Sequence, residues 1–145
     1  MDATELYYTP ATTLAAAIRA KEISPVEVTE AVLARIERLN PRLNAYCTVT
    51  AELARTTARA AEAAVMRGEA LGPLHGVPYS LKDLTPTRGI RTTFGSKIFE
   101  HHVPTEDAIL VERLRAAGGV LLGKTNTPEF GCKCRRCVAR TPLRG

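Results

Sequence analysis

Three stretches of the sequence hold residues that could do chemistry. Residues 118–125 read GGVLLGKT and fit G-x-x-x-x-G-K-[ST], the pattern of a loop whose backbone amides cradle nucleotide phosphates. Lys82 follows the apolar run 77–81 and could act as a base if burial lowers the pKa of its amine. Three cysteines between residues 132 and 137 could supply thiolates to a metal ion.

The phosphate-loop match at 118–125 lacks the context that such a loop needs. A phosphate loop follows a strand and opens a helix, so that the helix amides point at the phosphate. Here a predicted helix precedes Gly118, and the apolar run 120–122 is itself a predicted strand. We therefore interpret the match as the end of a helix followed by a buried strand, and we expect no nucleotide cofactor.

Residues 12–68 are predicted to be helical. The first helix is expected over 14–21, with a threonine at position 12 or 13 as its cap. The second begins at Ser24, where Ser-Pro-Val-Glu forms a capping box with proline at the first helical position. It is expected to end at Asn40, because the following proline disfavours a helical residue before it.

A third helix and a β-loop-α-β unit complete the predicted elements. The helix spans about 51–67 and stops at a glycine. Within residues 74–125, strand 77–81 is followed by a loop, by helix 106–117 and by strand 120–123. The simplest arrangement of the two strands is a parallel pair with a right-handed crossover.

This arrangement places Lys82 directly after a strand, at the carboxyl end where open α/β sheets bind ligands. Leu81 and Leu84 flank the lysine, so its amine could be partly buried and lose its proton more readily. The alternative is a solvated lysine that forms a weak surface pair with Asp83. Position alone favours that alternative.

Two long runs of the chain resemble the amino-terminal part of the amidase signature family. They are LGPLHGVPYSLKDL and GIRTTFGSKIFEHHVPTEDAILVERLRAAGGVLLGKTNTPEFG. The similarity covers most of the chain up to Gly131 and is strongest over 72–131. It implies an α/β fold, in which residues 1–131 form the amino-terminal part of a mixed sheet flanked by helices. Residues 132–145 are a separate basic, Cys-rich tail, and the sheet is expected to be incomplete.

The resemblance implies amide-bond hydrolysis by a Ser–cis-Ser–Lys triad, with Lys82 matching the catalytic lysine of the family. Its neutral amine would accept a proton through a bridging serine and so activate a nucleophilic serine. Lys124 is given no catalytic role. The residues of the TTFGS run match a family loop that packs near the site. The implied enzyme needs no cofactor or metal, and its substrate is a small-molecule amide. The family also includes the amidase subunit of tRNA-dependent amidotransferases, so amidotransferase partner subunits are possible.

The two serines of the triad lie, in the family, in a Gly- and Ser-rich segment downstream of the PEFG run. The only serines of this chain are Ser24, Ser80 and Ser96, and none lies in such a segment. We therefore expect these 145 residues to be inactive alone. Residues 138–145 resemble an altered form of the stretch that follows in the family, which suggests a truncated product.

The tail offers a rival interpretation as a non-catalytic binding module that contacts a metal ion or an acidic partner. Residues 131–145 carry five basic and no acidic residues, which accounts for the whole net charge of +5 and leaves the body neutral. Nucleic-acid binding is therefore not expected. A zinc site at Cys132, Cys134 and Cys137 needs a fourth ligand. The candidates are Cys47, His75, His101 and His102; otherwise the thiols are adventitious. No apolar run has the length of a membrane span, and we expect a cytoplasmic location.

Overall fold

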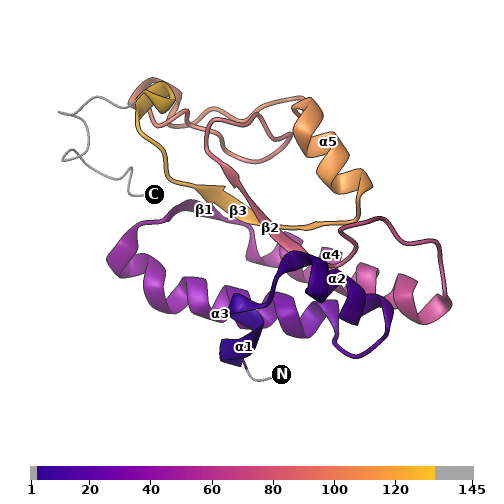
Figure 1. Cartoon of the computed structure of the whole chain (residues 1–145). Coiled ribbons are helices and arrows are strands. Elements are labelled where there is room, and N and C mark those ends of the chain that lie inside the picture. Colours follow the sequence, from indigo (N-terminus) through magenta and orange to yellow (C-terminus); the bar gives the residue numbers. More distant parts are fainter. Residues whose placement is uncertain (1–2, 133–145) are drawn as a thin grey trace.

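A small three-stranded sheet lies between two helical layers in a computed structural model, which describes residues 3–132 (Figure 1). The strand order is β1–β3–β2. β2 (Pro78–Lys82) pairs in parallel with β3 (Val120–Thr125), as the sequence predicts. β1 (Tyr46–Val49) pairs antiparallel with β3 and was not predicted. The result is the mixed sheet flanked by helices that the family resemblance implies.

Four helices cover one face of the sheet (Figure 1). They are α1 (Ala3–Tyr8), α2 (Ala11–Arg19), α3 (Pro25–Leu43) and α4 (Ala51–Arg67). Ser24 caps α3 as predicted, because its hydroxyl accepts from the amides of Val26 at 2.9 Å and Glu27 at 3.4 Å. Within residues 3–132 the return bond from the Ser24 amide to the Glu27 carboxylate, which would complete the capping box, is not formed. The predicted threonine cap of the first helix is wrong. Pro10 occupies that position, where it makes no side-chain cap bond.

The predicted end of α3 at Asn40 is also wrong, since the helix continues through Pro41 to Leu43. A proline in the last turn removes one backbone hydrogen bond. Asn40 compensates with both ends of its amide side chain, which bond the backbone oxygen and nitrogen of Tyr46 at 3.1 and 2.8 Å. These two bonds join the end of α3 to the start of β1.

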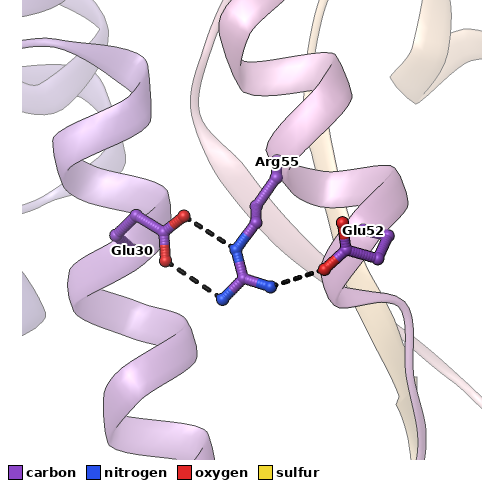
Figure 2. Close-up of polar contacts among 3 residues, drawn as sticks. All are labelled: Glu30, Glu52 and Arg55. Atoms are coloured by element: carbon purple, nitrogen blue, oxygen red, sulfur yellow. Dashed lines mark hydrogen bonds and ion pairs between the residues drawn. The ribbon is translucent and has the colours of Figure 1, made fainter.

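Small side chains let α4 approach α3 and the sheet closely. Ala54 and Ala58 are fully buried in an apolar cluster with side chains of α3 and β3. Arg55 forms an ion pair across the two helices: its Nε and Nη2 donate to the two oxygens of Glu30 at 2.8 and 3.2 Å (Figure 2). Nη1 bonds Glu52 of the same helix at 2.8 Å. The apolar cluster supplies the cohesion, and the ion pair helps to set the orientation of the helices.

The opposite face of the sheet is covered by α5 (Ile109–Ala116) and the long segment that precedes it (Figure 1). The predicted start of this helix at 106 is wrong. The Asp107 carboxylate instead accepts from the Arg88 amide at 2.7 Å and pairs with Arg115 at 2.8 Å. These contacts hold residues 105–108 in a non-helical conformation.

Two short 3₁₀ helices, Lys97–Phe99 and Glu129–Gly131, follow β2 and β3 in the loops beyond their ends. Among residues 3–132, no helix combines the length and apolarity that a membrane crossing requires.

Candidate active site

The candidate site lies at the carboxyl ends of the two parallel strands. Lys82 and Thr125 sit opposite each other there, in the last pair of the β2–β3 ladder. Two loops leave this edge and pack together. The amide of Phe130 donates to the Phe94 carbonyl at 2.7 Å, and the Ser96 hydroxyl donates to the Glu129 carboxylate at 2.7 Å. The edge is therefore a structured surface, of the kind at which α/β sheets bind ligands.

Lys82 is exposed at this edge, which corrects the expected partial burial. Leu81 and Asp83 on either side are only 3% and 1% exposed. Because side chains alternate along a strand, Lys82 projects away from that packed side. Its amine has no hydrogen-bond or ion-pair partner within residues 3–132. The alternative surface pair with Asp83 is not formed either, since Asp83 is buried.

Asp83 ties the end of β2 to the loop that follows. Its Oδ2 accepts from the amide of Thr93 at 3.0 Å and also from the hydroxyl of that threonine. Its own amide donates to the Thr125 carbonyl at 2.9 Å, and its carbonyl accepts from the Phe94 amide at 2.9 Å. Burial, reinforced by the negative charge of Asp83, raises the pKa of the Cys47 thiol to about 11. That thiol is therefore held in its protonated, unreactive form at neutral pH.

Lys124 forms a second buried anchor for the same loop. Its side chain is fully buried, and its ammonium donates to the hydroxyls of Thr87 at 3.0 Å and Thr92 at 2.8 Å. It also donates to the carbonyl of Thr85. Burial lowers the pKa of Lys124 to about 8, while the charge of Asp83 acts in the opposite direction. Lys124 lies within β3 and not at a helix start, which confirms that the GGVLLGKT match is no phosphate loop.

A bulge in β3 precedes Lys124. Tyr79 of β2 pairs with Leu121 of β3, and Leu81 pairs with Lys124. The chain therefore advances two residues in β2 but three residues in β3 between these pairs. The extra residue makes the register shift within the strand. Gly123 has φ +151°, and a Cβ placed on it would stand 2.2 Å from a backbone oxygen of β1. The bulge therefore needs glycine at this position.

The buried polar cluster around Asp83 and Lys124 was not predicted from the sequence. The TTFGS loop does pack at the candidate site, as the resemblance implies, since Thr92, Thr93 and Ser96 are all at most 1% exposed. The signal that could have revealed the cluster is a lysine in an apolar strand facing a threonine-rich loop. The alternation of side chains along a strand does not predict this cluster, because the bulge moves Lys124 to the other face of the sheet.

Two cysteines of the candidate zinc site, Cys134 and Cys137, lie outside the described residues, and the third, Cys132, is exposed. Within residues 3–132, no group of three or more His, Cys, Asp or Glu side chains is placed to hold a metal ion. His75, one of the candidate ligands, bonds the Ala61 carbonyl at 2.9 Å through its Nε2.

Comparison with known proteins gives consistent similarities. The family model described as Amidase matches residues 27–138. The chain is 51% identical over 126 residues to a glutamyl-tRNA(Gln) amidotransferase subunit of Carboxydothermus hydrogenoformans, covering 87% of this chain and 26% of that protein. It is 45% identical over 128 residues to an acylamidase of Rhodococcus erythropolis, with coverages of 87% and 26%.

The fold is similar to that of a solved amidase. The peptide amidase of Stenotrophomonas maltophilia superposes with a TM-score of 0.78 at 37% identity, covering 85% of this chain and 26% of that one. The chain thus spans about a quarter of the length of the curated relatives it matches.

Proposed function

Because the chain belongs to the amidase family, we propose that it provides the lysine base of an amide-bond hydrolase of the Ser–cis-Ser–Lys type. One observation supports the role of Lys82 above the others. Its amine stands at the carboxyl edge of the parallel strands with no partner among residues 3–132, so it is free to meet a hydroxyl. The buried lysine near the same edge, Lys124, has no such freedom.

In the proposed reaction, the serine-bearing segment covers Lys82, which is exposed among residues 3–132, and the burial favours its neutral amine. That amine accepts a proton from a bridging serine, which takes the proton of the nucleophilic serine. The serine oxygen attacks the amide carbon, and the C–N bond then breaks as the proton passes back to the leaving amine. Water attacks the resulting ester and releases the acid. Residues 1–145 hold no Gly- and Ser-rich segment, so we propose that they do not hydrolyse amides alone and need a serine-bearing segment.

A chimaera supplies that segment and tests the proposal. The aligned 128 residues of this chain replace their counterpart in the acylamidase of Rhodococcus erythropolis. We expect the chimaera to hydrolyse a simple aryl amide, and Lys82→Ala to lower kcat by about 10²–10⁴-fold, the usual contribution of a general base. Lys97→Ala is the matched control, because Lys97 is exposed and should leave kcat unchanged. A folded chimaera without activity, or full activity after Lys82→Ala, would contradict the proposal.

The substrate is proposed to be a small amide, with glutamine as one candidate. The similarity to a subunit of a glutamyl-tRNA(Gln) amidotransferase supports partner subunits for this chain and a cytoplasmic location, where charged tRNA is found. Placing the aligned 126 residues of this chain in that amidotransferase subunit tests the assignment. Retained release of ammonia from glutamine would favour it, and a folded chimaera that has lost glutaminase activity would count against it.

A further inference from the structure

We propose that Lys124 is a positioning residue for Lys82: its buried ammonium fixes the loop that follows β2 and so sets the backbone that carries the base. The inference rests on the proposed function, in which Lys82 is that base. Lys124 itself is fully buried and is not placed to touch a substrate.

The ammonium of Lys124 gathers three oxygens from the segment 85–92. The hydroxyls of Thr87 and Thr92 and the carbonyl of Thr85 converge on it, and the two hydroxyls also donate to backbone carbonyls of the same segment. Each of these two threonines is thereby fixed both to its own backbone and to β3. We call the three contacts on Lys124 the ammonium clamp.

The clamp acts on Lys82 through a short chain of backbone bonds. The Thr85 amide donates to the Lys82 carbonyl at 3.0 Å, and Thr85 is the residue whose own carbonyl meets Lys124. On the far side of the segment, Asp83 holds Thr93. The end of β2 is therefore fixed to both ends of the loop, by Lys124 through Thr85 and Thr92 and by Asp83 through Thr93.

The bulge in β3 directs the side chain of Lys124 toward the loop that follows β2. Leu122 packs against α3 and α4, and unbroken alternation would place Lys124 on that same face. The extra residue instead sets Lys124 opposite Leu81, which packs on the α5 face. Lys82 follows Leu81 and points the other way. The two amines therefore occupy opposite faces, and Lys124 influences Lys82 through the backbone and not by contact.

The choice of lysine at this position is costly, which supports a specific role. A buried ammonium loses its hydration, and apolar residues often replace buried charges without loss of stability. Leu121 and Leu122 of the same strand each pack in an apolar cluster. An apolar residue would fill the space, but it would leave the loop without a donor shared among three oxygens.

Residue-resolved amide hydrogen exchange on the 145-residue chain tests the clamp. Lys124→Met keeps the unbranched shape and removes the donor, and Lys97→Met makes the same change at an exposed site of the following loop. We expect exchange at the amides of Thr85, Ile90 and Thr93 to rise at least about tenfold in the first variant, as loss of charged hydrogen bonds implies. Exchange within α4 should change less than about twofold. Unchanged loop exchange, or an equal change in the control, would overturn the proposal.

Thr92→Val is the second variant, for the case in which Lys124→Met does not fold. It removes one acceptor of the clamp, so exchange at Ile90 and Thr93 should rise about threefold or more. The same loop amides remaining at the wild-type rate would overturn the clamp as well.

The acylamidase chimaera tests the positioning role, because a misplaced base lowers kcat and leaves KM within about twofold of the parent value. We expect Lys124→Met to lower kcat at least about tenfold, since small displacements of reacting groups cost rate. Unchanged kcat beside accelerated loop exchange would overturn the positioning role. An inactive parent chimaera would defeat the proposed function, and with it the role assigned to Lys82, while the exchange experiment would still judge the clamp.

Discussion

Gly123→Ala tests whether the β3 bulge depends on the absence of a side chain. The new methyl group would stand 2.2 Å from the Thr48 oxygen and 3.0 Å from the Val49 Cα, both backbone atoms that a rotamer change cannot move. Alanine at φ +151° carries strain of about 1–3 kcal/mol. Separating β1 from β3 to relieve the clash weakens ladder hydrogen bonds worth about 1 kcal/mol each. We therefore expect a total loss of about 3–5 kcal/mol of unfolding free energy.

Gly89→Ala is the matched control for this perturbation. Gly89 also has a positive φ, +74°, but a Cβ there meets nothing within 4 Å, so only the conformational strain of about 1–2 kcal/mol applies. Urea unfolding followed by far-ultraviolet circular dichroism gives the free energies of both variants. If the loss of unfolding free energy in Gly123→Ala is no larger than in Gly89→Ala, the clash with β1 is absent. If the unchanged chain shows no cooperative unfolding in urea, that result would contradict the packing of the buried apolar clusters.

Three further predictions concern stability. The Lys124 pKa of about 8 lies below its ordinary 10.5, so unfolding binds a proton and stability should rise from pH 8 to 9, by on the order of 1 kcal/mol. The pKa of Cys47, raised to about 11, lowers stability as the pH rises above 9, and so opposes the effect of Lys124. In Cys47→Ala, the stability measured by urea unfolding should therefore keep rising toward pH 10.5. A fall in stability between pH 8 and 9 would contradict the lowered pKa of Lys124. Ser24→Ala should lose about 1 kcal/mol of unfolding free energy in urea, whereas Ser24→Thr should lose less; equal losses would exclude the cap. Arg55→Met should lower the unfolding free energy only slightly, and by less in 1 M salt, since its pair with Glu30 is part exposed; a salt-independent loss would argue against the ion pair.

Local signals predicted the elements that depend on nearby residues. The cap at Ser24 and the glycine that ends α4 are both where the sequence places them, because each depends on contacts within one helical turn. The parallel β2–β3 pair also follows from the order strand, helix, strand. The short strand β1 was missed, since four residues give too little pattern to detect without their partner strand.

The predicted ends of α3 and α5 were wrong because contacts outside the local helical turn are present at both. Asn40 bonds Tyr46 at the start of β1 where α3 continues through Pro41, and Arg88 and Arg115 engage Asp107 just before α5. Helix propensities and capping rules depend on residues within the same helical turn, so they do not predict contacts of this kind.

The amino-acid sequence by itself determined the family, the strand directly before Lys82 and the rejection of a phosphate loop. Those conclusions rest on residue order, which a linear chain already contains. Only the tertiary structure decided that Lys82 is exposed while Lys124 is buried. For Lys124 the reason is physical: one extra residue in β3 reverses the direction of the side chains after it, and that insertion exists only relative to β2, with which β3 pairs.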